Sequence, residues 1–215
     1  MRGRRLALRA LLAGVFAAAL VGPAQRVDSA DGAGRVRGRV TLDLAGTTLA
    51  DVGPIVVFLD GVDRPLSFPA PQEQPAVHQR DARFAPSFLA IAAGTTVQMP
   101  NDDAIFHNVF SYSKPNDFDL GLYPAGQSRS VPFRHPGVVK AYCSIHESMN
   151  GTIYVAPSPW FTTAGASGRF EIAGIPPGRY KLATWCERLP ATEREITVRP
   201  GETLSVDIPL AASKP

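Results

Sequence analysis

Histidine and cysteine are scarce in this chain of 215 residues, which contains four histidines and two cysteines. A multicopper oxidase or a copper nitrite reductase needs extra histidines for its catalytic copper, so both of these enzyme classes are excluded. The sequence also lacks a serine, histidine and aspartate arrangement and a phosphate-binding loop, and we therefore expect a protein that is not an enzyme. The four histidines and two cysteines are enough for one mononuclear metal site.

Long apolar runs are also missing, since a membrane-spanning helix takes about 20 residues. The uncharged run Ala10–Val21 is shorter, and it follows four arginines within residues 2–9. This order is typical of a secretory signal, so we expect a signal peptide over residues 1–24 and a mature protein that is periplasmic or secreted. Cleavage after Ala24 or after Ala30, retention as an uncleaved anchor, and Sec or twin-arginine export all stay open.

The chain has no excess of basic residues outside its first 24 residues. The formal net charge is +3, and residues 1–24 contain four arginines and no acidic residue, so their removal changes the charge from +3 to −1. A chain without a basic excess does not attract nucleic acid. We therefore expect no nucleic-acid partner, and no membrane span after the signal is removed.

Helical periodicity is absent too, and short segments of alternating apolar and polar residues follow one another between glycines and prolines. This pattern predicts an all-β fold class, with a Greek-key sandwich and a second small β-sandwich. The proline-rich segment 62–77 is expected to be a linker. The predicted strands cover residues 35–42, 55–59, 88–90, 95–99, 138–143, 152–155, 168–172, 179–185, 194–198 and 203–208.

One segment has the residue types of a copper site. Cys143 is followed by His146 and Met149 at offsets of three and six residues, and His107 lies 36 residues before the cysteine. Thiolate, imidazole and thioether groups are the ligands that copper selects, and two histidines and a cysteine with a weak axial methionine form a blue-copper electron-transfer site. We expect Cys143 to end a strand and the next two ligands to lie on the tight loop after it.

Two other interpretations of these residues stay open at this point. In an exported protein, Cys143 and Cys186 would more often form a disulfide. Zinc would prefer more cysteines or histidines and no methionine. If the copper site is correct, we expect Cys186 to be a buried free thiol, and we expect His78 and His135 to lie at the surface.

The stretch from Phe84 to Val155 resembles the cupredoxins, and the amicyanins and pseudoazurins most closely. The resemblance rests on the runs Gly-Thr-Thr-Val at 94–97, Asn-Asp-Asp at 101–103, His-Asn-Val at 107–109 and the segment 137–146 that leads into the cysteine–histidine loop. It implies one mononuclear type 1 copper and a protein redox partner. The implied copper ligands are His107, Cys143 and His146 in the equatorial plane and Met149 on the axis.

The resemblance also implies that Asn108 links the two ligand loops by hydrogen bonds. The sequence departs from amicyanin at Glu147-Ser148, where a carboxylate beside the ligand could change the docking surface and lower the reduction potential. Residues 118–123 are also unlike amicyanin. They match exported proteins that are labelled methylamine utilization protein, a label that does not define a function.

The flanking segments are similar to another module. Residues 168–182, with a Pro-Pro-Gly turn, resemble the second half of the carboxypeptidase-regulatory-like, transthyretin-like β-sandwiches, and residues 36–42 and 55–59 resemble the first half. We therefore predict a discontinuous sandwich over 34–70 and 160–212, with a cupredoxin domain over 74–157 inserted into it. The alternative is that residues 34–70 belong to the cupredoxin itself.

Together these patterns predict an exported blue-copper protein that carries single electrons between redox partners. Two alternatives are a copper-binding carrier or storage protein in metal homeostasis, and a structural or glycan-binding β-sandwich with a vestigial site.

Overall fold

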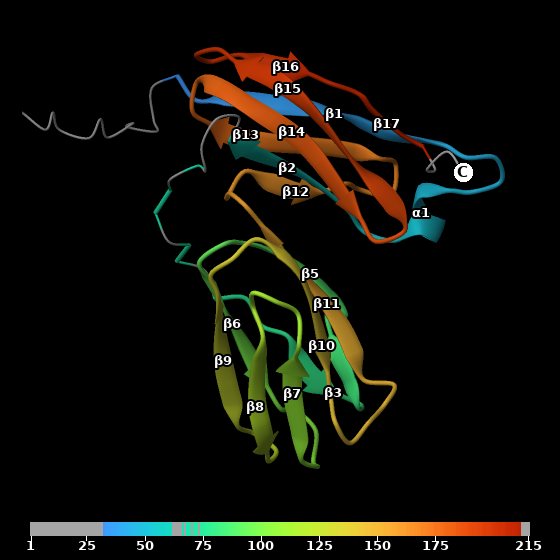
Figure 1. Ribbon diagram of the computed structural model, residues 1–215, viewed down its shortest axis with the longest axis vertical. Coiled ribbons are helices and arrows are strands. Elements are labelled where there is room, and N and C mark those ends of the chain that lie inside the picture. The colour runs from blue at the N-terminus through green and yellow to red at the C-terminus, as the bar shows by residue number, and fades with distance from the viewer. Residues whose placement is uncertain (1–31, 62–65, 67, 70, 73, 212–215) are drawn as a thin grey trace, which may run out of the picture.

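The protein is described by a computed structural model that covers residues 32–61, 66, 68–69, 71–72 and 74–211 (Figure 1). Within these residues the chain forms strands β1 to β17 and one four-residue helix, α1 (Leu49–Val52). The predicted all-β fold class is therefore confirmed. The predicted signal peptide, 1–24, lies outside the described residues. No helix in the described part is both long and apolar enough to cross a membrane.

The first group of strands, here called the flanking unit, combines strands from both ends of the described chain. In Figure 1 the blue β1 lies among the orange and red strands that follow residue 160. One sheet has the order β13-β1-β16, with β17 also paired to β1, and the other has the order β12-β2-β14-β15. Their bounds are β1 Gly34–Asp43, β2 Ile55–Gly61, β12 Phe161–Thr163, β13 Arg169–Ile175, β14 Gly178–Cys186, β15 Leu189–Val198, β16 Thr203–Ser205 and β17 Ile208–Ala211.

The two sheets of the flanking unit enclose one apolar core. Residues at every second position of β1 are buried or half-buried, with Val36 and Val40 fully buried, while the arginines between them are exposed. These valines pack with Leu59 of β2 and Leu182 of β14 in a single cluster. The alternation in the sequence therefore assigns each β1 side chain to the core or to solvent.

The second group, here called the central unit, is continuous in sequence from 78 to 156. Its sheets have the orders β5-β11-β10-β7-β8, β6-β9 and β3-β4. Residues from the larger sheet and from β6-β9, among them Val97, Phe133 and Ile153, form a second core cluster. The bounds are β3 His78–Arg80, β4 Arg83–Ala85, β5 Phe88–Ala92, β6 Thr95–Pro100, β7 His107–Ser111, β8 Phe118–Tyr123, β9 Ser128–Phe133, β10 Gly137–Tyr142 and β11 Asn150–Ala156.

A third, aromatic cluster joins the two units. Trp185 of β14 stacks on Phe88 of β5, with ring centroids 5.9 Å apart and planes within 5°, and on Tyr154 of β11 at 4.8 Å. Lys140 of β10 also pairs with Glu187 at the end of β14. The outer face of the sheet that contains β2 and β14 therefore packs against the large sheet of the central unit.

The strand pairing bears on the predicted domains. β1 pairs with β13, β16 and β17, and β2 pairs with β12 and β14, as a discontinuous sandwich requires. In the alternative, residues 34–70 would belong to the cupredoxin itself. Among the described residues, neither β1 nor β2 pairs with a strand of the central unit, so the pairing does not support this alternative. The domain boundaries themselves, 34–70 with 160–212 and 74–157, stay a prediction.

Several elements differ from the sequence prediction. The segment 203–208 is divided between two strands, β16 and β17, because the Asp207 side chain accepts the Arg39 amide and so interrupts the backbone ladder. Six strands were not predicted, β3, β4, β7, β8, β9 and β12. Of these, β3, β4 and β12 have three residues each, too few to show a period of two. Helix α1 was also missed, since a single turn shows no helical periodicity.

Candidate metal centre

The loop that connects β10 to β11 supplies most of the candidate ligands. β10 ends at Tyr142, one residue before the predicted end, and Cys143 follows directly. The Cys143 amide donates to the carbonyl of Met149 (3.2 Å), and the Met149 amide donates to the carbonyl of His146 (2.9 Å). These two backbone hydrogen bonds close a tight loop over residues 143–149, so the ligand spacing in the sequence becomes a fixed geometry.

His107 approaches this loop as the first residue of the neighbouring strand β7. The Cys143 Sγ atom lies 3.8 Å from His107 Nδ1 and 3.9 Å from His146 Nδ1. The two Nδ1 atoms lie 3.1 Å apart. The structure therefore brings three of the four predicted ligands together, with one sulfur and two nitrogens within 4.8 Å of one another.

These spacings fit a single metal ion. With metal–nitrogen bonds of about 2.0–2.1 Å and metal–sulfur bonds of about 2.3 Å, the values for zinc sites, ligands at angles of about 100–125° are separated by about 3.1–3.9 Å. The observed separations fall in this range. The distances alone suit zinc as well as copper, so the choice of metal depends on the chemistry of the donor set.

Burial separates the three donors by their access to solvent. His107 is fully buried and Cys143 is 6% exposed, whereas His146 is half-buried at the surface. The fourth predicted ligand, Met149, is 1% exposed and belongs to the same core cluster as Cys143. Its assignment as an axial ligand stays a prediction.

An aspartate that sequence reasoning missed fixes the orientation of His107. His107 Nε2 lies 2.7 Å from the Oδ2 atom of Asp103. Because an ionised carboxylate only accepts hydrogen bonds, Nε2 carries the proton and the lone pair of Nδ1 faces Cys143 and His146. The signal that could have revealed this contact is the spacing of four residues between the two side chains.

Asp103 is itself held by the turn between β3 and β4. The Asp81 amide donates to its Oδ1 (2.6 Å), and the Ala82 amide donates to its Oδ2 (2.9 Å). Asp81 and Ala82 have positive φ angles of 54° and 50°, which turn both amides in the same direction. Burial acts to raise the pKa of the Asp103 carboxyl, but the hydrogen bonds from Ala82, His107 and Asp81 lower this pKa below its usual value.

The neighbouring carboxylate, Asp102, has different partners. Its Oδ2 atom lies 2.7 Å from His78 Nδ1 and 2.8 Å from an Arg80 nitrogen. Hydrogen bonds from His78 and then from Arg80 lower the pKa of this carboxyl. The two adjacent aspartates therefore have different partners. Asp103 holds the buried candidate ligand His107, and Asp102 belongs to a partly exposed ion pair.

Asn108 connects the two ligand segments, as the resemblance implied. Its Oδ1 atom accepts hydrogen bonds from the Ser144 amide (2.7 Å) and from the Ser144 hydroxyl (2.9 Å). The residue after His107 is therefore tied to the residue after Cys143. The prediction of a link between the loops is confirmed.

A buried polar network lies next to His107. Tyr123 of β8 is paired with His107 in the strand register, and its hydroxyl donates to the Met99 carbonyl (2.8 Å). The buried Gln79 amide contacts both the Tyr123 hydroxyl and the same carbonyl. Burial raises the pKa of Tyr123 to about 12, so this ring is neutral near pH 7.

The remaining cysteine and histidines lie away from the cluster. Cys143 and Cys186 are both free, so the alternative of a disulfide is wrong, and Cys186 is buried as expected, with its thiol 3.3 Å from the Val52 carbonyl. His135 is exposed, as predicted. His78 is partly exposed in its pair with Asp102.

Comparison with known proteins gives matches to solved structures only, since no family model and no curated protein matches this chain. A purple cupredoxin from Nitrosopumilus maritimus is 26% identical, with a TM-score of 0.35 over 39% of this chain and 100% of that chain. A reduced amicyanin mutant is 22% identical, with a TM-score of 0.37 over 40% of this chain and 84% of that chain. Another amicyanin mutant, in a reduced Cu(I) form, is 20% identical, with a TM-score of 0.37 over 46% of this chain and 97% of that chain. More than half of this chain therefore has no counterpart in any one of these structures.

Proposed function

We propose that the chain is a blue-copper protein that binds one mononuclear type 1 copper and carries single electrons between redox partners. The observation that carries this proposal is the convergence of Cys143 Sγ with the Nδ1 atoms of His107 and His146. A cysteine and two histidines with a buried methionine nearby form the donor set of such sites, and zinc would not select a thioether. Copper bound there would supply one-electron chemistry.

The chain's own residues would hold the donors in one arrangement. Asp103 fixes the ring of His107, and Asn108 fixes the start of the loop that carries Cys143 and His146. Backbone hydrogen bonds across residues 143–149 hold the rest of that loop. Donors held by the fold need little rearrangement when the charge on the bound ion changes, and this favours fast electron transfer.

The burial of the candidate ligands argues against a storage or delivery function. Because the shell around a metal site controls access to it, a protein that releases its copper needs ligands that a recipient can reach. Here His107 has no exposed surface and Cys143 has 6%, so only His146 is accessible from solvent. A site of this kind favours retention of the metal, and the electron would pass through the exposed edge of His146.

The surface around His146 suits a protein redox partner. Ile145 directly precedes His146, Ile105 and Phe106 directly precede His107, and each of these three side chains is at least 50% exposed. Exposed apolar side chains of this size near a polar site are typical of a protein docking surface. We propose that the partner docks on this apolar rim, with export to the periplasm or the medium as the sequence predicts.

The test is to add Cu(II) to the purified mature protein and to record the visible and EPR spectra. We expect one equivalent of copper to produce an intense thiolate-to-copper charge-transfer band and a narrow copper hyperfine splitting. A colourless complex with an ordinary Cu(II) EPR spectrum would contradict the proposal.

A second measurement separates an electron carrier from a copper store. The loaded protein is reduced and reoxidised in the presence of a chelator for Cu(I), and the retained metal is measured after each cycle. Retention of copper through repeated cycles supports an electron carrier. Loss of copper to the chelator on reduction would favour storage or delivery instead.

A further inference from the structure

The flanking unit has a row of arginines on its outer face. On β1, Arg35, Arg37 and Arg39 alternate with buried or half-buried residues, and all three are exposed. Residues two positions apart on a strand are separated by about 6–7 Å, so the row places positive charges at that interval along the sheet. Nothing in the candidate metal centre uses these residues.

The strand register adds a further arginine to this row. Arg39 is paired with Arg169 of β13, directly across the antiparallel ladder. Like charges at directly opposite positions destabilise a sheet, because the two side chains lie within about 5 Å of each other at their Cβ atoms. An arrangement of this kind becomes favourable when an anion lies between the two guanidinium groups.

The acidic residues nearby do not neutralise this pair. Glu171, which is opposite Arg37, forms its ion pair with Arg35 at 2.8 Å. Asp207 accepts a hydrogen bond from the backbone amide of Arg39 rather than from its side chain. Within the described part of the chain, no ion pair involves Arg37, Arg39 or Arg169.

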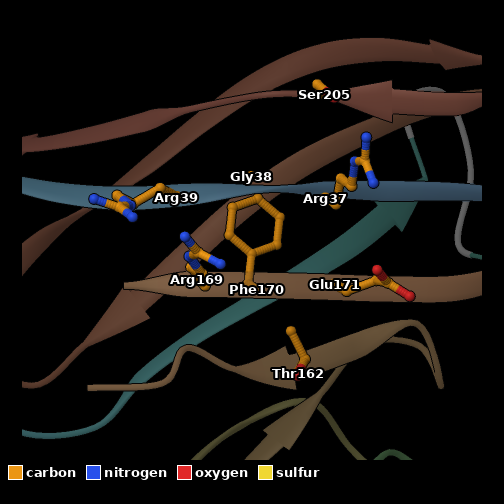
Figure 2. A pocket seen from close by; sticks show the side chains of 8 residues that line it. All are labelled: Arg37, Gly38, Arg39, Thr162, Arg169, Phe170, Glu171 and Ser205. Atoms are coloured by element: carbon orange, nitrogen blue, oxygen red, sulfur yellow. The ribbon is translucent and has the colours of Figure 1, made fainter. Parts of the chain in front are cut away.

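These three arginines line one hollow of about 690 Å³. In Figure 2, Arg39 and Arg169 lie on one side of Phe170 and Arg37 lies on the other. The hydroxyl residues Thr162 and Ser205 also line it, and they can donate further hydrogen bonds. The hollow thus combines three guanidinium groups with two hydroxyl groups, and Glu171 is the single carboxylate among its lining residues.

We propose that this hollow is a binding site for a ligand with two oxyanion groups about 6–7 Å apart. Arg39 and Arg169 together bind one group, and Arg37 binds the other. All the cationic side chains in the hollow are arginines, whose planar fork binds carboxylate and phosphate through two parallel hydrogen bonds. The ligand class is therefore a small oligophosphate or a dicarboxylate.

The surface favours a small ligand over nucleic acid or a membrane. Single-stranded nucleic acid binds through aromatic side chains on which its bases stack, and lipid surfaces take up exposed apolar side chains. In the described residues, the large exposed apolar side chains lie between Ile105 and Ile145, in the central unit. Phe170 is the one aromatic residue that lines the hollow, and at 5% exposure it has no free ring face for a base, so the hollow offers charge and hydroxyl groups to a ligand.

The proposal is tested by calorimetric titration of the purified mature protein with tripolyphosphate, adipate and inorganic phosphate. We expect tripolyphosphate or adipate, each with two anionic ends, to bind at least tenfold more tightly than inorganic phosphate. Binding should weaken as salt is added, because the contacts are charged and exposed. Tighter binding of tripolyphosphate would assign the ligand as an oligophosphate, and tighter binding of adipate would assign it as a dicarboxylate.

The variants R39Q and R169Q should each weaken that binding by about ten- to hundredfold, the range expected for the loss of a charged hydrogen bond. R194Q is the matched control, since Arg194 is an exposed arginine on β15 that is not part of the hollow. It should leave the affinity unchanged. R169Q should also leave the melting temperature unchanged or raise it, because it removes the opposition of like charges.

Three results would overturn the proposal. One is that none of the three probes binds. Another is that R194Q weakens binding as much as R169Q, which would mean that only net charge matters. The third is that an oligothymidylate of eight nucleotides binds as tightly as the preferred small anion.

Discussion

The central and flanking units are built by the same alternation of apolar and polar residues, yet they present different surfaces to solvent. Around the candidate ligands the central unit exposes apolar side chains such as Phe106 and Ile145. The flanking unit exposes the arginines of β1 and β13. The core-facing positions determine the β architecture in both units, and the outward positions are free to acquire different binding properties.

The two free cysteines offer the strongest test of this contrast, since both are buried and each belongs to one unit. We expect C143S to abolish the thiolate-to-copper band completely, because it removes the sulfur donor. C186S should leave the band intact, because this thiol lies in the flanking core and contacts the Val52 carbonyl. The check is the visible spectrum of each variant with one equivalent of Cu(II), and loss of the band in both variants would show that Cys186 takes part in the site.

A second test concerns the contact between the units. W185A should lower the free energy of unfolding by about 2–3 kcal/mol, since it removes a half-buried indole that stacks on Phe88 and Tyr154. W185F retains an aromatic ring, so it should lower the free energy of unfolding much less than W185A does. Chemical denaturation measured by circular dichroism gives both values, and equal stability of W185A and the unmodified protein would mean that the stack does not hold the units together.

The third prediction separates the adjacent aspartates. D103N should weaken copper binding by about ten- to hundredfold, the usual effect of removing a hydrogen-bond partner from a ligand histidine. D102N is the matched control, and it should leave copper affinity nearly unchanged because Asp102 contacts His78 and Arg80 instead. Competition with a chelator of known affinity measures both values. Equal weakening by the two substitutions would mean that Asp103 has no specific positioning role.

The smallest expected effect belongs to Glu147, which is exposed beside His146. E147Q should raise the reduction potential by roughly 10–40 mV, because a nearby negative charge stabilises the oxidised ion and solvent screens most of that effect. Cyclic voltammetry at low ionic strength provides the measurement. A potential that falls would contradict the predicted sign.

The residues that could be predicted from the sequence are those whose partners are close in the chain. Cys143, His146 and Met149 lie in one hairpin loop, and the structure brings the donor atoms of Cys143 and His146 together there, while the ligand role of Met149 stays a prediction. His107 was predicted from its residue type and from the family resemblance, and the pairing of β7 with β10 brings it to the loop. The all-β class followed from alternation, which is a local property.

The contacts around the two candidate sites that escaped prediction join distant segments of the chain. The support of Asp103 comes from the turn at Asp81 and Ala82, about twenty residues earlier, and no local pattern reveals it. The pairing of Arg39 with Arg169 likewise depends on a strand register across most of the chain. Periodicity predicts which face of a strand a residue occupies, but not which residue lies opposite.

The pairing of β1 with strands near the other end of the chain has a consequence for the order of folding. All strands of the central unit follow one another between residues 78 and 156 and pair among themselves, so their pairing needs no strand that is synthesised later. β1 must wait for β13, β16 and β17. Once the central unit has folded, it shortens the loop that must close before β1 pairs, and this lowers the entropic barrier to forming the flanking sheets. The unit that carries the candidate metal centre would thereby act as the folding nucleus for the rest of the chain.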